Sequence, residues 1–220
     1  HDHEDLDASH IVGLITGDAS KLAFAFLNPD LGEAVVVAMP ERMRIAIQRA
    51  GKLPKEDPLH HFLIAIAEHM ILPMAQYQWG ESWRKKQPFG TVLYNTDNTD
   101  SCAWARSGFA NNDIAQDLCR LVSALQFSMQ HSVSSLWWPT DMNTLADLLS
   151  RMLDEDGNVT AKGQADFETE NSKLERPYRI LRPDEVKQEV YELVQWIGQA
   201  DHAFSQLSPI QLGASQQLER

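Results

Sequence analysis

Four residues with side chains that commonly bind metals lie within the segment 57–79: His60, His61, Glu68 and His69. Imidazole nitrogens and carboxylate oxygens are the usual protein ligands of zinc and of non-haem iron. Apolar residues recur here at spacings of three and four, and Asp57 before Pro58 is typical of a helix start. We therefore predict that all four residues lie on one helix, as a candidate site for a divalent metal ion.

The geometry of a helix does not bring these four side chains to one point. His61 and Glu68 point in similar directions, but they lie two turns apart, roughly 10 Å along the axis. The HExxH motif, whose histidines lie one turn apart, does not occur. A metal site here needs ligands from other elements, for example Asp113 or Asp117. Without them the four residues are polar groups at the surface and boundary of a helix, and no cofactor is expected.

Two other segments carry weaker metal-binding patterns. Residues 154–160 are similar to the first half of an EF-hand calcium loop, with side chains that carry ligand oxygens at positions one, three and five. Val159 stands where that loop needs Gly, and Ala165 where its bidentate Glu belongs. His1 and His3 form a copper-chelating pattern only if His1 is a mature amino terminus.

Four tryptophans are candidate interaction residues: Trp79, Trp83, Trp137 and Trp138. They lie in or beside segments that lack a regular apolar pattern. Large aromatic side chains in such places either fix the connection to the core or form a recognition surface. The basic run 84–86 beside them holds three cations, which is short for a track that follows a nucleic-acid strand.

The apolar pattern of the whole chain predicts an α+β, mainly α-helical fold in a single globular domain, 1–220. A three-stranded β meander is expected over 10–39, because turn signals at 17–20 and 28–32 separate short apolar runs. About five helices follow, and a small hairpin is possible near 91–105. We expect a disordered or tag-like start at 1–8, a long polar loop at 154–177 and a frayed end at 208–220.

The composition excludes several classes of protein. The net charge is −12, which disfavours general nucleic-acid binding. Residues 1–7 hold four acids and no base, and residues 154–170 hold six acids and one lysine, so these two segments carry nine of the twelve excess charges. No apolar run is long enough to span a membrane. Two cysteines are too few for a disulfide framework, and we expect a cytoplasmic protein.

The sequence contains no GxSxG, GxxxxGK[ST] or GxGxxG motif. We therefore expect a non-catalytic binding or interaction protein, a regulatory, inhibitory or accessory factor that docks on another protein. A homo-oligomer is possible. The alternative is a metal-dependent hydrolase with its His and Glu site on the 57–79 helix. DNA mimicry ranks below both, because most of the excess negative charge lies in the two polar segments.

Overall fold

The computed structural model describes residues 10–199, and the chain begins there with a β meander. Strands β1 (Ile11–Ala19), β2 (Ala23–Asn28) and β3 (Glu33–Ala38) pair antiparallel in succession. The first turn is closed by Ser20, whose backbone N–H donates to the carbonyl of Ala23 at 3.0 Å. The second contains Gly32 at φ +63°, a conformation that glycine adopts without strain.

Three more strands extend this meander into one six-stranded mixed sheet. Strand β4 (Gly90–Thr96) pairs parallel with β1, and β5 (His131–Trp137) pairs parallel with β4. On the far side, β6 (Arg179–Ile180) pairs parallel with β3. The order across the sheet is β5-β4-β1-β2-β3-β6. Strand β1 is therefore central, with an antiparallel neighbour on one side and a parallel neighbour on the other.

Helix α2 (Pro58–Lys86) lies against the middle of the sheet and is apolar on nearly every side. The Asp57 side chain caps it by accepting the N–H of Leu59 at 2.9 Å. Close packing on β1 depends on glycine: a Cβ at Gly17 would lie 2.5 Å from Cγ2 of Ile71. We expect from the sequence that Pro73 kinks or ends this helix, but the helix continues for thirteen residues beyond it.

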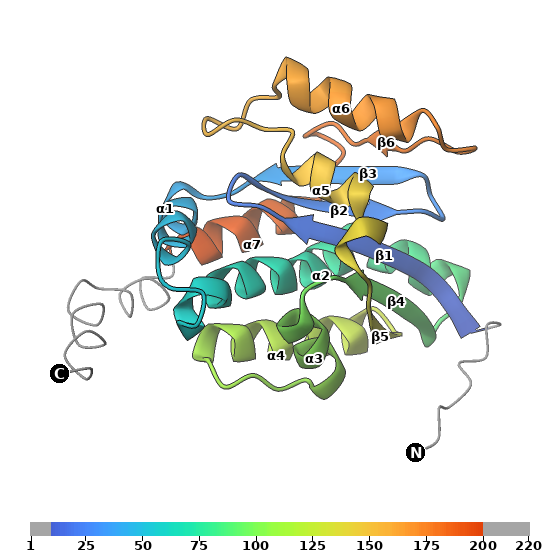
Figure 1. Cartoon of the computed structure of the whole chain (residues 1–220). Coiled ribbons are helices and arrows are strands. Elements are labelled where there is room, and N and C mark those ends of the chain that lie inside the picture. The colour runs from blue at the N-terminus through green and yellow to red at the C-terminus, as the bar shows by residue number, and fades with distance from the viewer. Residues whose placement is uncertain (1–9, 200–220) are drawn as a thin grey trace.

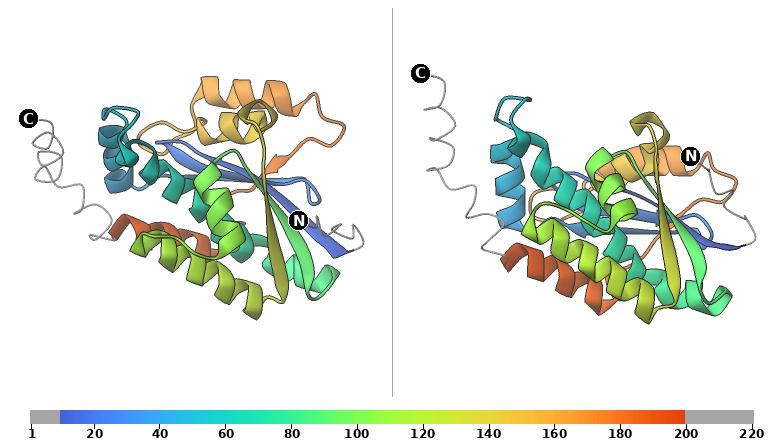
Figure 2. Two further views of the ribbon diagram at one scale, coloured as in Figure 1. Left: turned by 60° about the horizontal axis from the view of Figure 1, so that its bottom comes forward. Right: turned by 90° about the horizontal axis from the view of Figure 1, so that it is seen from below.

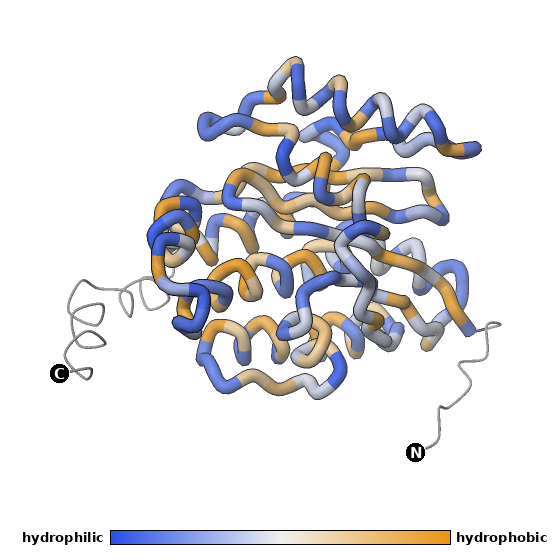
Figure 3. Tube along the Cα trace, in the orientation of Figure 1, coloured by the Kyte–Doolittle hydropathy of each residue, from blue (hydrophilic) through white to orange (hydrophobic). Residues whose placement is uncertain are grey.

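Helices cover both faces of the sheet (Figures 1 and 2). On the face of α2 lie α1 (Glu41–Ala50), α3 (Thr99–Ser107), α4 (Asp113–Ser128) and α7 (Gln188–Gln199). On the opposite face lie α5 (Thr144–Ser150) and α6 (Ala161–Asn171). Each interface has its own cluster of buried apolar side chains. Figure 3 shows hydrophobic residues concentrated in the central strands and α2, whereas α6 is mostly hydrophilic.

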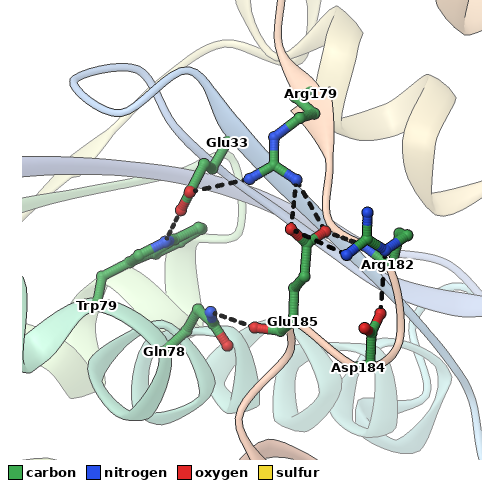
Figure 4. A network of polar contacts seen from close by, with 7 residues as sticks. All are labelled: Glu33, Gln78, Trp79, Arg179, Arg182, Asp184 and Glu185. Carbon is green, nitrogen blue, oxygen red and sulfur yellow. Dashed lines mark hydrogen bonds and ion pairs between the residues drawn. The ribbon is translucent and has the colours of Figure 1, made fainter.

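A polar network attaches the segment before α7 to the sheet and to α2 (Figure 4). Arg179 donates to both carboxylate oxygens of Glu185, at 2.7 and 2.8 Å, and lies 3.5 Å from Glu33. The other oxygen of Glu33 accepts the indole N–H of Trp79 at 2.7 Å. Gln78 donates to the carbonyl of Glu185 at 3.2 Å. These bonds fix the position from which α7 starts.

The two edges of the sheet offer little free backbone. At the β5 edge, Gln126 accepts the N–H of Val133 at 2.7 Å, and Arg106 donates twice to the carbonyl of Ser135 at 3.2 Å. At the other edge, β6 is only two residues long. Side-chain hydrogen bonds at β5 and the short length of β6 thus limit the pairing of these edges with strands of another molecule.

The structure corrects the predicted fold class. An α+β fold made of a three-stranded meander plus about five helices is wrong: the described residues form a six-stranded mixed sheet with seven α-helices, an α/β fold. The hairpin near 91–105 is also wrong. Residues 90–96 pair with β1 and β5, and residues 99–107 are helical, capped by Asn98, which accepts the N–H of Ser101.

The segment 154–177 is not one long polar loop, because α6 occupies residues 161–171. Thr160 caps this helix by accepting the N–H of Gly163 at 3.0 Å, and Phe167 is its one buried apolar side chain. The predicted start at 1–8 and end at 208–220 lie outside the described residues. None of the helices between residues 10 and 199 combines the length and apolarity that crossing a bilayer requires.

Candidate functional site

Three carboxylate side chains from distant parts of the chain meet at one end of the sheet. Asp18 is the penultimate residue of β1, Asp97 directly follows β4, and Glu68 belongs to α2. One carboxylate oxygen from each lies within 4.8 Å of the others. Asp18 and Glu68 are buried and Asp97 is partly exposed, so this acidic site is open to solvent on the Asp97 side.

The topology explains why these residues meet. Because β1 and β4 are parallel neighbours, their carboxyl ends lie side by side. The chain leaves β1 toward β2 on one side and leaves β4 toward β5 on the other. Connections that diverge in this way open a crevice at the strand ends, where open α/β sheets bind their ligands. Asp18 and Asp97 lie at that point.

Glu68 is held in place but keeps one oxygen free. Its Oε1 accepts the backbone N–H of Ala19 at 2.7 Å, and its own carbonyl accepts the hydroxyl of Tyr94 at 2.9 Å. The side chain is 3% exposed, and Oε2 has no hydrogen-bond partner among the described residues. A buried, ionisable oxygen without a partner is costly, and either a proton shared with Asp18 or a bound cation would satisfy it.

Helix α5 supports Asp18 from the opposite face of the sheet. The Ser150 hydroxyl donates to Oδ2 of Asp18 at 2.5 Å. Asn143, just before α5, accepts from the hydroxyl of Thr16 at 2.7 Å and donates to the carbonyl of Gly17 at 2.8 Å. These bonds tie both ends of α5 to β1. They also bring a fourth acid, Asp147, close enough to influence the charge of Asp18.

Trp137, at the end of β5, holds the backbone of Asp97. Its indole N–H donates to the Asp97 carbonyl at 3.0 Å. The turn is further fixed by Thr96, whose hydroxyl oxygen accepts the N–H of Asn98 at 3.1 Å. Trp137 is 51% exposed, so a large aromatic ring lies in solvent directly beside the acidic site.

Burial, and then nearby negative charges, disfavour the charged forms of Asp18 and Glu68. Burial raises the pKa of Asp18 from 3.8 to about 6; the bond from Ser150 opposes this rise, while the charges of Asp147 and Asp97 add to it. Burial also raises the pKa of Glu68 well above its usual value, and the charge of Asp18 raises it further. Protons therefore occupy this site more readily than ordinary carboxylates, unless another cation replaces them.

No basic side chain neutralises the acidic site. Within residues 10–199, none of Asp18, Glu68 and Asp97 forms an ion pair with lysine or arginine. The charge of Arg151 lowers the pKa of Asp18, but by less than burial raises it. Arg151 is bound to Asp147, with its Nη2 at 2.7 Å from Oδ1. Three oxygen ligands with unbalanced negative charge suit a hard divalent cation such as Mg²⁺ or Mn²⁺.

The histidines predicted as ligands lie elsewhere. His60 contacts the carbonyl of Leu53 through Nδ1 at 2.8 Å, and its ring packs edge-on against His61. His69 is fully buried, with Nδ1 3.3 Å from the Ser101 hydroxyl and Nε2 3.7 Å from the sulfur of Cys119. Burial lowers its pKa to about 4, so it is neutral at pH 7. Of the four predicted residues, the acidic site contains Glu68 alone.

The other ligands suggested by the sequence are not part of this cluster. Asp117 is paired with Arg120 at 2.8 Å, and Asp113 lies in the first turn of α4. Oδ1 of Asp154 accepts the N–H groups of Asp156 and Asn158, at 3.0 and 2.8 Å, so the segment resembling a calcium loop forms a turn that uses its own first acid. His1 and His3 lie outside the described residues.

The four tryptophans divide into two pairs. Trp79 and Trp83 are 1% and 2% exposed and pack in the core between α2 and the sheet. Trp137 is exposed at the acidic site, and Trp138 lines a cavity of about 260 Å³ with Met142 and Tyr178. Only the second pair is placed where a ligand could contact it.

Sequence reasoning missed Asp18 and Asp97 because both lie in segments interpreted as polar turns. A signal was present: each acid comes at the end of a short apolar run, 10–16 or 91–94. Acids at strand ends become significant only when the two strands are known to be neighbours. Comparison of the chain with protein-family models, with curated proteins and with solved structures returned no match.

Proposed function

We propose that this protein is a divalent-metal-dependent hydrolase of phosphate esters, with phosphodiester bonds of nucleic acid as its substrate. The observation that carries the proposal is Glu68, whose Oε2 is buried without a hydrogen-bond partner among the described residues and whose carboxylate clusters with those of Asp18 and Asp97. Such an arrangement is costly in the empty state and is stabilised by a cation, as expected of a site built to bind one.

The ligand set favours Mg²⁺ or Mn²⁺ over zinc. Both ions prefer carboxylate oxygens, and Mg²⁺ is commonly held by few carboxylates together with the phosphate of a substrate. Asp18, Glu68 and Asp97 would hold the metal. Since Asp97 faces solvent, the open side lies where a phosphate can approach. The bound metal would supply charge stabilisation to a phosphoryl group in its transition state.

The reaction that fits this site is in-line hydrolysis of a phosphate ester bond. The oxygen of a water bonds to phosphorus, and the ester bond breaks with its electron pair on the leaving oxygen. That oxygen gains the proton that the water gives up. The chain's own contribution is positioning: Ser150 orients Asp18, Ala19 orients Glu68 and Trp137 orients the backbone of Asp97.

Trp137 supports nucleic acid as the substrate. Exposed aromatic rings stack on bases, and each stacked base contributes about 1–3 kcal/mol. The net charge does not oppose this as strongly as −12 suggests, because nine of the excess charges lie in residues 1–7 and 154–170. This proposal departs from the expectation that nucleic-acid binding is disfavoured, since a metal ion and one stacking ring do not need a basic surface.

A non-catalytic protein that docks on another protein stays a second proposal. What favours it is an acidic groove on the helical face, described below. A hydrolase centred on His60, His61, Glu68 and His69 is less well supported, because the histidines bond to other groups. A cytoplasmic location stays a prediction, supported by two buried free cysteines, Cys102 and Cys119.

Cleavage assays test the proposal. The full chain is incubated with 5′-labelled single-stranded DNA, single-stranded RNA, duplex DNA and an RNA–DNA hybrid, with Mg²⁺, with Mn²⁺ or with EDTA. Bis(p-nitrophenyl) phosphate and p-nitrophenyl phosphate separate diester from monoester activity. We expect metal-dependent cleavage of at least one polymer, reduced at least about 100-fold in Asp18→Asn and Glu68→Gln.

Glu175→Gln is the matched control, because Glu175 is an exposed acid with no side-chain bond to a described residue. It should cleave like the wild type. Cleavage that persists in EDTA or in both site variants contradicts the metal site. Absence of cleavage of every substrate by a protein that binds Mn²⁺ contradicts the hydrolase.

A further inference from the structure

A groove lies between α2, α4 and α7. These helices lie on the side of the sheet away from α5 and α6 (Figure 2). The volume of the groove is about 460 Å³. Leu118 and Leu193 are buried in its floor, and Leu121 is half-buried beside them. An apolar floor of this size accepts one or two large apolar side chains, as a groove that binds an amphipathic helix does.

The rim of this groove is acidic. Glu189 and Glu192 lie one turn apart on α7, and both are exposed. Neither forms an ion pair with any residue between 10 and 199. Both line the groove together with Tyr77, and after burial their charges raise the pKa of Tyr77. Asp117 adds a third carboxylate from α4, bound to Arg120.

Trp196 adds a large aromatic surface to the rim. It is 40% exposed and lies one turn beyond Glu192 and two turns beyond Glu189, on the same stripe of α7. Tryptophan is the residue type most enriched among side chains that dominate binding energy. It also attracts cations to its ring face. An apolar floor, two unpaired carboxylates and a half-exposed indole are together complementary to a surface that is apolar and basic.

The groove is separate from the acidic site. Tyr77 follows Glu68 by nine residues on α2, which is about 13 Å along the axis and half a turn around it. The two sites therefore use opposite sides of one helix. A ligand in the groove does not contact Asp18, Glu68 or Asp97.

We propose that the groove between α2, α4 and α7 binds a basic amphipathic helix of a partner protein, with its apolar side chains on Leu118 and Leu193 and its lysine or arginine side chains on Glu189 and Glu192. Trp196 covers one end of the bound helix. This surface is independent of the proposed hydrolase activity, and it would bring the acidic site to a location set by the partner.

Titration of the full chain with a synthetic helix tests this proposal. The probe is an amphipathic peptide of leucine and lysine, labelled with a fluorophore and followed by anisotropy at 50 mM NaCl. A peptide of the same pattern with glutamate in place of lysine is the control ligand. We expect saturable binding of the basic peptide, weakened about tenfold by Glu189→Gln with Glu192→Gln, and about tenfold by Trp196→Ala.

The matched protein control is Asp156→Asn with Glu175→Gln, which removes two exposed acids that do not line the groove. It should bind the basic peptide like the wild type. If it weakens binding as much as the groove variant, the attraction is general and the proposal is wrong. Failure of the basic peptide to bind, or equal binding of the acidic peptide, also overturns it. Circular dichroism confirms that each variant is folded, and cleavage by the groove variants should equal that of the wild type.

Discussion

Replacing Asp18 by asparagine should make the metal-free protein more stable while abolishing its stabilisation by metal. The change removes one charge from a buried site that already contains Glu68 and Asp97. It keeps the shape of the side chain, and the amide oxygen of asparagine can still accept the hydroxyl of Ser150, which lies 2.5 Å from Oδ2 in the wild type. The substitution therefore isolates the effect of the charge.

The magnitude follows from the pKa of Asp18, which rises from 3.8 in an exposed chain to about 6 in the fold. An acid with a raised pKa in the fold favours folding only while it is protonated. Its charge thus costs nothing below pH 3.8, and the cost grows as the pH rises to about 6 and is then constant. Each pKa unit is worth about 1.4 kcal/mol, so the full cost is about 3 kcal/mol at pH 8 and roughly half as much at pH 5.

Urea unfolding in EDTA at pH 8 and pH 5 measures this cost. Asp18→Asn should exceed the wild type by up to about 3 kcal/mol at pH 8 and by roughly half as much at pH 5. With Mg²⁺ at a hundred times its dissociation constant, the wild type gains about 2.7 kcal/mol and the variant gains far less. The advantage of the variant should therefore nearly disappear when metal is present.

Two results would refute this reasoning. One is a variant that is less stable than the wild type in EDTA at pH 8, which would mean that the Asp18 charge is favourable in the fold. The other is a variant that Mg²⁺ stabilises as much as the wild type, which would mean that Asp18 is not a ligand. Glu175→Gln should change neither quantity.

Three further predictions concern substrate binding, acid stability and packing. Trp137→Ala should raise KM for an oligonucleotide about tenfold with a smaller change in kcat, measured by steady-state cleavage; a change in kcat alone would contradict stacking. Burial lowers the pKa of His131 to about 4, so its neutral form favours folding above pH 6.5 and this contribution fades as the pH falls toward 4. The stability difference between wild type and His131→Gln should therefore shrink by about 2 kcal/mol between pH 7.5 and pH 5 in urea unfolding, and a constant difference would contradict the burial effect. Gly17→Ala should lower the free energy of unfolding by about 1–3 kcal/mol, because the new Cβ would lie 2.5 Å from Cγ2 of Ile71. Gly51→Ala is the control and should change the stability little, because its Cβ would lie 3.4 Å from the nearest atom. Equal melting temperatures of the two variants would contradict close packing of α2 on β1.

The sequence predicted the parts of the fold that depend on neighbouring residues. Apolar runs separated by turn signals mark the β meander, although residues 17–19 belong to β1 and the first turn lies at 20–22. A capped apolar pattern marks α2 from Asp57 onward. The predictions that are wrong concern segments whose structure depends on residues far away in the sequence. Residues 90–96 look like half of a hairpin, but their partners are β1 and β5, and nothing local indicates parallel pairing across α2.

Helix α6 was missed for a different reason. It buries only Phe167 and Asn171, so it has no apolar stripe, and its cap at Thr160 is the one local signal. The acidic site was predictable in part: Glu68 stood out by its type, while the histidines around it drew the interpretation toward the wrong ligands. Asp18 and Asp97 become partners of Glu68 only through the order of the strands.

The protected edges of the sheet restrict how this protein can assemble. Pairing of two copies through their sheets would require Gln126 and Arg106 to release the backbone of β5, or would have to rely on the two residues of β6. Within the described residues, contact between copies or with a partner is therefore expected to use side chains on helices and connections, and not backbone pairing at the sheet edges. The affinity of such an assembly depends on side chains at the surface. A few substitutions there can change which partner binds while the central strands stay unchanged.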